Sequence, residues 1–353
     1  MKATILQGPR ECRVVELADP AVPDDGLVLA VKACGICGSD VRRWNEGPPP
    51  ESGGLVPGHE AAGAVLAVGR SVSDYAPGDR LAIAPDVHCG QCYYCRCGRY
   101  NLCDDLRLIG ITPGLPGAFA QRLVLTGEIL RNGIVHRMPE ALSFVEAALA
   151  EPCSSVIAAH DAAGTSPKDT VAILGAGPIG CLHAVVARSR GARVIVSEPN
   201  ASRRSMAEQF EPDAVIDPSS EDVVARVREF TGGRGADVVI CANPVAETAT
   251  QAVEMVRKAG RVVLFGGLPK ARPMVSLDAN RIHYGEIVVV GSFSYPPTVH
   301  ARALDLIARR VIPADRLITH TFALEQIDRA FETAASGAGL KIVVTMAENP
   351  RAA

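Results

Sequence analysis

The sequence predicts an α/β protein of two domains, a β-rich first half followed by a doubly wound parallel sheet. Two observations lead to this fold class. Over roughly the first 140 residues, short β-branched runs alternate with turns rich in Gly and Pro, which is typical of β structure. From residue 169 onward, most of the apolar runs of strand length are separated by segments of helical periodicity. Repeated β-α alternation indicates a parallel sheet covered by helices on both faces.

The expected elements can be placed in order along the chain. In the first half, the strand-like runs are 27–33, 61–69 and 79–85. In the second half, the strand-like runs are 170–177, 192–199, 213–218, 236–243, 260–267 and 286–293. The clearest helical patterns between them are 178–191 and 245–260. Towards the C-terminus we expect helices over 300–311 and 324–336 and a last strand over 341–346.

Composition excludes several classes of protein. The 353 residues, 48% of them hydrophobic and 21% charged, suffice for two globular domains of roughly 150 residues each. A net charge of −3 and 4% aromatic residues do not suit nucleic-acid binding, so we expect no nucleic-acid partner. A glycine turn interrupts the longest uncharged run, 170–187, which predicts a buried strand and helix and no membrane span. The first residues lack the apolar core of a signal peptide, which favours the cytoplasm.

Five of the eleven cysteines lie within residues 88–103. Such a cluster is either a disulfide framework or a metal site, and in a reducing cytosol closely spaced thiolates usually bind a metal. The spacing C-x2-C-x2-C-x7-C is formed by Cys89, Cys92, Cys95 and Cys103. Four thiolates complete a tetrahedral zinc shell without an open position, so we predict a structural zinc here. Cys97 lies among these ligands and could replace a neighbour, although Cys95 keeps the even spacing; a chance group of free thiols is the alternative.

Residues 171–199 have the pattern of a strand, a glycine turn, a helix and a second strand. Gly175, Gly177 and Gly180 fit G-x-G-x-x-G, in which the glycines allow a tight turn, close approach to a pyrophosphate and close helix packing. Pro178 and Ile179 begin the helix, whose N-terminus attracts phosphate. The pattern therefore predicts a dinucleotide site, against the alternative of a glycine turn without a ligand.

An acidic residue ends the second strand of this unit. Glu198 stands where a carboxylate accepts hydrogen bonds from the adenosine ribose, and it would repel a 2′-phosphate. We therefore expect NAD(H) as the cofactor, with NADP less favoured. Arg203 and Arg204 lie close by and keep NADP open as an alternative; Arg203 is included among the expected cofactor-binding residues.

A second set of possible ligands is more widely spaced. It consists of Cys37 with Asp40, His59 with Glu60, and Glu151. Spacing alone does not distinguish these residues from a small buried cysteine and a structural histidine.

The segments GHEAAG (58–63), GDR (78–80), the four-cysteine lobe and EPCSSV (151–156) precede the glycine turn in that order. In this combination the chain resembles the zinc-dependent medium-chain dehydrogenase/reductase family, and within it the polyol (sorbitol) and threonine dehydrogenases. The resemblance covers nearly the whole chain and includes residues 318–343. It implies a GroES-like catalytic domain over 1–147, with the zinc lobe at about 88–104. It further implies a Rossmann domain over 148–280, and a segment 281–353 that largely returns to the catalytic domain.

The resemblance also implies roles for the second set of residues. Cys37, His59 and Glu60 match the ligands of a catalytic zinc, and Glu151 matches a carboxylate that binds the zinc directly or through water. Asp40 matches the acid that orients the histidine, and Ser39 the hydroxyl that relays the substrate proton. Cys153 is a further soft donor, since related alcohol dehydrogenases use a cysteine in this region. Two zinc ions per chain, one catalytic and one structural, are therefore expected.

The implied reaction is hydride transfer between a secondary alcohol and NAD(H). The expected substrate is a polyol, a cyclitol or a sugar-alcohol phosphate. Arg43 stands where relatives acting on phosphates have arginine, although it could equally be a solvated residue like Arg42. Phe293 matches a substrate-facing aromatic residue, and Ser294 replaces the arginine of sorbitol dehydrogenases.

Other functions remain as alternatives. A threonine or small secondary-alcohol dehydrogenase would have the same residues. A zinc-free quinone reductase would lack both metal constellations, and a non-catalytic zinc-lobe binding protein would need no cofactor turn. We also expect a homo-oligomer, a tetramer in preference to a dimer.

Overall fold

The computed structural model describes residues 1–48 and 55–346. The chain forms two compact units, the first made of Met1–Ser154 and Tyr295–Ala353 and the second of Ser155–Ser294. The first unit is built mainly on antiparallel strands, and the second contains a parallel sheet with helices. The predicted fold class is therefore confirmed.

The first unit contains a sheet in which eight strands are paired among the described residues. Along the main path its order is β15 (Ile318–Ala323), β16 (Lys341–Thr345), β3 (Leu27–Gly35), β4 (Glu60–Val68), β5 (Arg80–Val87) and β6 (Arg107–Leu108), with β7 (Arg122–Leu125) paired to β3 and β8 (Gly133–Arg137) paired to β5. A separate antiparallel pair is formed by β1 (Lys2–Gly8) and β2 (Glu11–Glu16). Seven of the nine residues of β3 are buried, which fits a central strand.

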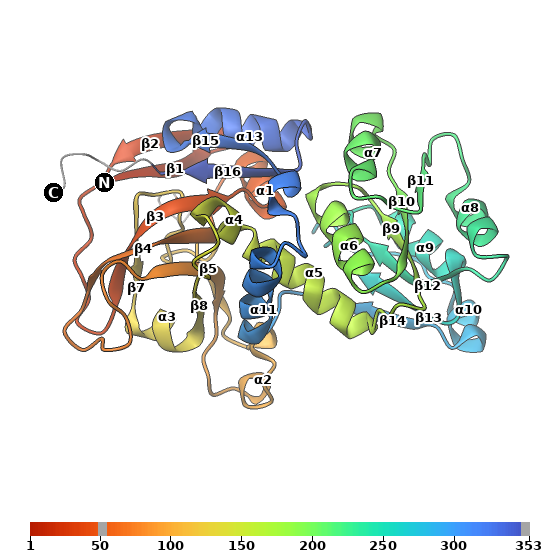
Figure 1. Ribbon diagram of the computed structural model, residues 1–353, viewed down its shortest axis with the longest axis horizontal. Coiled ribbons are helices and arrows are strands. Elements are labelled where there is room, and N and C mark those ends of the chain that lie inside the picture. The colour runs from red at the N-terminus through yellow and green to blue at the C-terminus, as the bar shows by residue number, and fades with distance from the viewer. Residues whose placement is uncertain (49–54, 347–353) are drawn as a thin grey trace. The chain divides into compact units, whose positions relative to one another are not determined.

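Short helices surround this sheet. They are α1 (Gly38–Glu46), α2 (Tyr93–Arg96), α3 (Gly127–Asn132), α4 (Phe144–Ala148), α11 (Pro297–Ala308), α12 (Ala314–Leu317) and α13 (Ile327–Ser336), with 3-10 turns η2 (Tyr100–Leu102) and η3 (Leu324–Gln326). The strip along α13 that contains Ile327, Ala330 and Phe331 is buried, and α13 packs beside β15 and β16 (Figure 1). Phe331 stacks on Trp44 of α1 at 5.6 Å between ring centroids, so the returning C-terminal segment completes the core of the first unit.

The second unit is a six-stranded parallel sheet (Figure 1). Its strand order is β11 (Ala214–Ile216), β10 (Arg193–Ser197), β9 (Thr170–Leu174), β12 (Ala236–Cys241), β13 (Val256–Leu264) and β14 (Val288–Gly291). Its helices are α6 (Pro178–Ser189), α7 (Ala201–Glu208), α8 (Val223–Phe230), α9 (Ala246–Met255) and α10 (Ala279–Gly285). The direction of strand succession reverses between β9 and β12, and at such a switch point a doubly wound sheet binds ligands.

One predicted helix is too long. The pattern over 245–260 predicts a single helix, but α9 ends at Met255 and β13 begins at Val256. Val256 pairs with Ala236 of β12, and Ala259 has a positive φ of 53°, which a helix does not allow. The prediction failed because strand pairing overrides local helical periodicity in this segment.

The borders of the two units differ from the expected 148 and 280. The first border falls inside α5 (Ala150–Ala163), a continuous helix that sequence patterns would not divide. The second falls after β14, because this last strand pairs with β13 and belongs to the parallel sheet. None of the helices in the described part of the chain is long and apolar enough to cross a membrane.

Candidate active site

Three potential metal ligands meet where β3 ends and β4 begins. Donor atoms of Cys37, His59 and Glu60 all lie within 4.8 Å of one another. The two strands are antiparallel and Gly35 pairs with Glu60, so the segment after β3 reaches the residue before β4. A Cβ atom at Gly35 would overlap the Glu60 carboxylate, which explains the glycine there. Thiolate, imidazole and carboxylate are donors that zinc takes, so this set fits a zinc ion.

Asp40 holds the histidine of this cluster. It is the third residue of α1 and accepts a hydrogen bond from the Cys37 amide at 3.0 Å, while its other oxygen lies 3.5 Å from Nδ1 of His59. Burial alone would raise the pKa of Asp40, but the charge and hydrogen bond of His59 lower it. Burial alone would likewise lower the pKa of His59, but Asp40 raises it well above its usual value. A carboxylate behind one ring nitrogen directs the other towards a metal.

A buried lysine that sequence reasoning missed also reaches the cluster. Lys341 is 5% exposed, donates from Nζ to the Ile36 carbonyl at 2.9 Å and contacts the Glu60 carboxylate. Burial opposes its charge, but Glu60 and then Cys37 outweigh it and raise the pKa of Lys341. The ammonium therefore balances the carboxylate. The sequence signal was a lysine at the start of an otherwise apolar strand, brought here by the pairing of β16 with β3.

Glu151 lies in the first turn of α5, outside the group of three ligands. Its Oε1 accepts a hydrogen bond from the Tyr295 hydroxyl at 3.1 Å. Burial, followed by the charge of Glu60, raises the pKa of Glu151 to about 7. Burial similarly raises the pKa of Tyr295 well above its usual range, so the phenol is the donor. Cys153 is fully buried, and burial raises the pKa of its thiol, which keeps the sulfur protonated.

The other residues expected near substrate lie in more open positions. Ser39 is exposed in the first turn of α1. Arg43, in the last turn of the same helix, is partly buried and donates from Nη1 to the Ile111 carbonyl at 3.0 Å. Phe293 belongs to the second unit and is 58% exposed. Of these three residues, Arg43 is the one whose side chain is seen to hydrogen-bond a backbone carbonyl.

The four-cysteine lobe forms a second group of metal donors. The sulfurs of Cys89, Cys92, Cys95 and Cys103 all lie within 4.8 Å of one another. The Cys89 amide donates to Sγ of Cys103 at 3.2 Å, and the Cys92 amide to Sγ of Cys89 at 3.3 Å. Hydrogen bonds from the backbone amides of Cys95 and Asp104 lower the pKa of Cys92 to about 7. Four sulfurs with amide donors fit a structural zinc.

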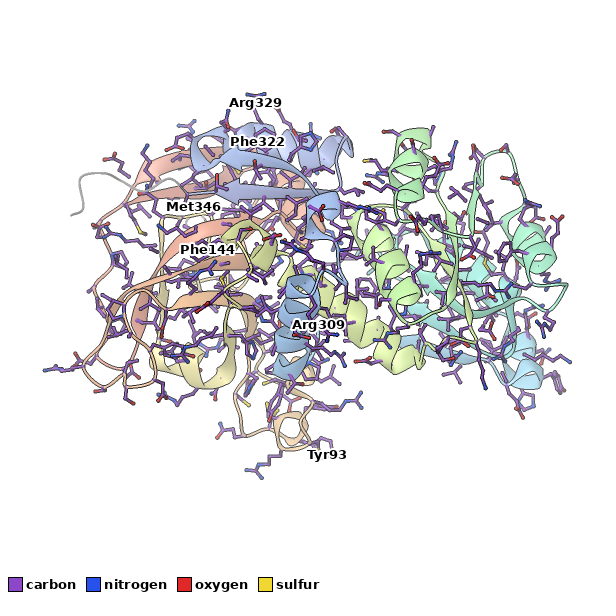
Figure 2. The ribbon with its side chains drawn as sticks, in the orientation of Figure 1. Tyr93, Phe144, Arg309, Phe322, Arg329 and Met346 are labelled. Atoms are coloured by element: carbon purple, nitrogen blue, oxygen red, sulfur yellow. The ribbon has the colours of Figure 1, made fainter. Side chains whose placement is uncertain are left out.

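Two exposed residues mark the outside of this lobe. Cys97 is exposed and lies outside the group of four sulfurs. Tyr93, at the start of α2, is 73% exposed and extends away from the fold (Figure 2).

The glycine turn lies between β9 and α6 in the second unit. Gly175 has a positive φ of 110°, and a Cβ atom at Gly180 would overlap the Gly175 carbonyl oxygen. Gly177 caps α6, and a Cβ atom there would meet no other atom within 4 Å. The turn is therefore closed on the Gly180 side and open at Gly177. An open glycine at a helix N-terminus suits the approach of a pyrophosphate.

Glu198 follows β10 beside this turn. Its two carboxylate oxygens accept hydrogen bonds from the amides of Ala176 at 2.7 Å and Asn200 at 3.0 Å. Arg204 donates to the carbonyls of Glu198 and Pro199 and pairs with Asp217 at 2.8 Å. The Arg203 amide binds the Asn200 side chain. The carboxylate is thus fixed at the end of a strand, as ribose recognition requires.

Comparison with known proteins gives two family matches. Residues 23–134 match the alcohol dehydrogenase GroES-like domain, and residues 178–309 match the zinc-binding dehydrogenase domain. Sorbitol dehydrogenase of Bacillus subtilis (strain 168) is 34% identical over 342 residues, 95% of this chain and 93% of that protein. D-arabitol-phosphate dehydrogenase of Enterococcus avium is 31% identical over 350 residues, 98% of this chain and 97% of that protein.

A solved structure of a Sinorhizobium meliloti 1021 protein bound to NADP is also similar. Its TM-score is 0.88 at 35% identity, and the match covers 98% of both chains. Fold and sequence similarity therefore extend over both units.

Proposed function

Because the chain belongs to the zinc-dependent medium-chain dehydrogenases, we propose that it oxidises a secondary alcohol of a polyol or sugar-alcohol derivative to the ketone, and catalyses the reverse reaction. The observation that carries this proposal is the group of partly buried Cys37 with buried His59 and Glu60, whose donor atoms lie within 4.8 Å of one another. The sorbitol and D-arabitol-phosphate dehydrogenases among its relatives support the substrate class.

A catalytic zinc would be held by Cys37 and His59 with a carboxylate from Glu60 or Glu151. When bound, such an ion polarises an alcohol oxygen and makes its proton easier to lose. Glu60 already shares its charge with Lys341, whereas Glu151 is held by a neutral phenol. This difference favours Glu151 as the carboxylate that faces the metal or a water molecule beside it.

The protein's own side chains then have defined tasks. Asp40 keeps the His59 ring in one orientation. Ser39, exposed in the first turn of α1, accepts the proton of the alcohol and passes it to solvent. The open turn at Gly177 and the α6 N-terminus hold the pyrophosphate of the cofactor, which supplies the hydride acceptor.

Metal content and turnover test this proposal together. We expect a zinc-to-chain ratio of about two, one ion in each group of donors. Cys37→Ser should abolish alcohol oxidation and lower the ratio by about one, whereas Cys92→Ser should lower the ratio by about one and reduce the melting temperature. Cys97→Ser is the control, because its sulfur lies outside the group of four, and should leave both unchanged. Full turnover in Cys37→Ser would contradict the zinc mechanism, and zinc loss in Cys97→Ser would contradict the choice of ligands.

We also propose NAD(H) as the preferred cofactor, since the fixed Glu198 carboxylate repels a 2′-phosphate. A structural relative is bound to NADP, so the preference of this chain for NAD(H) over NADP needs a direct measurement. The NAD/NADP ratio of kcat/KM should exceed about ten and should fall sharply in Glu198→Ala. Equal use of both cofactors by the wild type would assign selectivity to Arg203, because Arg204 is engaged by two carbonyls and Asp217.

Arg43 is the residue we propose for binding an anionic substrate group. Its Nη1 is engaged by the Ile111 carbonyl, a contact that fixes the guanidinium, and a guanidinium presents several further donors to a phosphate. The kcat/KM of a polyol phosphate should then exceed that of the free polyol, and Arg43→Ala should raise KM for the phosphate alone. An equal effect on both substrates would remove Arg43 from substrate binding and leave the dehydrogenase proposal intact.

We also propose that the protein is a cytoplasmic homo-oligomer. The cytoplasmic location is supported by the closely spaced zinc-binding thiolates, which suit a reducing compartment.

A further inference from the structure

Tyr295 hydrogen-bonds the Glu151 carboxylate. It is 1% exposed, and its hydroxyl donates to Glu151 Oε1 at 3.1 Å. The donor lies 144 residues from the acceptor and belongs to the segment that returns to the first unit. Burial keeps the phenol of Tyr295 protonated, so the tyrosine is the donor whenever Glu151 is ionised.

The position of the tyrosine is itself constrained on both sides. Ser294 before it has a positive φ of 48°, and Pro296 after it caps α11, which begins at Pro297. Proline fixes its own φ and restricts the preceding residue, so the backbone around Tyr295 has little freedom.

The aromatic ring of Tyr295 is also supported. It lies parallel to the His300 ring, with 6.4 Å between centroids and 9° between planes. His300 in turn has Nδ1 at 3.1 Å from Nδ1 of His136 on β8. Backbone and ring supports together keep the hydroxyl at one place.

A fixed donor decides which oxygen of Glu151 is available. A free glutamate rotates about three side-chain bonds, and its two oxygens exchange places. With Oε1 held by Tyr295, this exchange is restrained, and Oε2 is the oxygen that the Tyr295 hydroxyl does not occupy. Groups that hold a metal-binding side chain in this way typically change metal affinity or activity by about 10-fold to 100-fold when they are removed.

We propose that Tyr295 is a positioning residue that holds Glu151 by Oε1 and thereby presents Oε2 to the catalytic metal or its water. The proposal rests on the function proposed above and adds a residue and an orientation to it. Tyr295 itself need not touch substrate. Its effect should therefore pass entirely through Glu151.

Tyr295→Phe tests the proposal because it removes the hydroxyl and keeps the ring. The variant should bind two zinc ions, as the wild type should, and melt at a similar temperature. Its kcat for polyol oxidation should fall by about 10-fold to 100-fold, and zinc should pass from the catalytic site to a chelating dye faster by a similar factor. Tyr75→Phe is the matched control: Tyr75 is a partly buried tyrosine of the same unit that packs under Arg137.

The Glu151→Ala background separates positioning from general packing. There the further change Tyr295→Phe should alter neither kcat nor the rate of zinc transfer, because no carboxylate remains to be held. Equal effects in both backgrounds, unchanged kcat and zinc transfer in Tyr295→Phe, or a Tyr295→Phe protein that fails to fold would each overturn the proposal. A wild type without alcohol dehydrogenase activity would contradict the proposed function instead, and the zinc-transfer comparison would still test the Tyr295 contact.

Discussion

Two buried histidines on facing helices of the second unit stand apart from the chemistry described above. His183 of α6 has Nδ1 at 3.2 Å from Nε2 of His160 on α5, and Nδ1 of His160 lies 2.9 Å from the Thr165 hydroxyl. Neither ring is accessible to solvent. Burial lowers the pKa of His160 to about 3 and that of His183 well below its usual value, and Arg190 adds to the effect on His160 while Asp161 opposes it.

These histidines should make the second unit sensitive to acid. The unfolded chain binds a proton at each histidine below about pH 6.5, whereas the folded chain does not until the pH approaches the lowered pKa. The contribution of these histidines to stability is therefore complete above about pH 6.5 and is lost as the pH falls towards the lowered pKa. For His160, lowering the pH from about 7.5 to about 5 should cost about 2 kcal/mol of unfolding free energy.

Urea unfolding of wild type and His160→Gln at the two pH values measures the contribution of His160 to the pH dependence of the unfolding free energy. The variant should lose about 2 kcal/mol less than the wild type over the same interval. His283→Gln, at an exposed position on α10, is the control and should keep the wild-type pH dependence. An identical pH dependence in wild type and His160→Gln would show that His160 does not contribute.

At the scale of single residues, some members of the site could be predicted from the sequence and others could not. Cys37, His59 and Glu60 stand within short motifs at strand ends, so their types and the family resemblance made them visible. Lys341 and Tyr295 carry no such motif, and each meets its partner only through a contact made far along the chain. Contacts of this kind depend on strand pairing and on the path of the returning segment.

Among the elements, the turn from β9 to α6 contains two glycines that we expect to be required for different reasons, one for the fold and one for cofactor binding. Gly180 is needed for the fold, because a Cβ atom there would overlap the Gly175 carbonyl oxygen. At Gly177 a Cβ atom would meet nothing in the protein within 4 Å, so the fold does not require this glycine and we expect it to serve the cofactor. One substitution should therefore damage the structure and the other only the binding.

We expect Gly180→Ala to lower the melting temperature, because overpacking against backbone costs about 1–3 kcal/mol. Gly177→Ala should melt like the wild type but bind NADH at least about tenfold more weakly, since a methyl group would fill the space that the pyrophosphate approaches. Thermal unfolding and fluorescence titration with NADH distinguish the two variants. Unchanged NADH affinity in Gly177→Ala would mean that the cofactor does not approach this glycine.

Most elements of the second unit were predictable, because a parallel sheet buried on both faces leaves continuous apolar runs in the sequence. The segment 256–260 was not, since its helical periodicity continues that of α9 while Val256 already pairs with Ala236. The elements that we did not predict include longer ones, such as α1 and α5, and very short ones, such as α2, α12 and β6. Elements of two to four residues are fixed by their surroundings, here by the cysteine lobe and by neighbouring strands.

At the scale of the whole molecule, β14 is a sheet edge with apolar surroundings. It is the last strand of the six-stranded sheet, and its residues Val288–Gly291 include neither proline nor a charged side chain. Val288 is 53% exposed, and Tyr284 and Phe293 on either side of the strand are 77% and 58% exposed. Edge strands are usually protected by charge, proline or a covering element, so this one suits pairing with another strand.

We expect a second copy of the chain to be the partner of this edge. Two identical edges related by a twofold axis run antiparallel, so each would supply the other's missing hydrogen bonds and Tyr284 would become covered. Such pairing would account for a dimer, and the tetramer expected from the sequence would need a further surface. We expect sedimentation to give a mass that is a multiple of 37.1 kDa for the wild type. Val288→Lys should shift it towards the single chain, because a charged lysine on an edge strand opposes pairing with another edge. Leu66→Lys, at a 46% exposed position of the first unit, should leave the mass unchanged. A wild-type mass retained in Val288→Lys would place the contact between copies elsewhere.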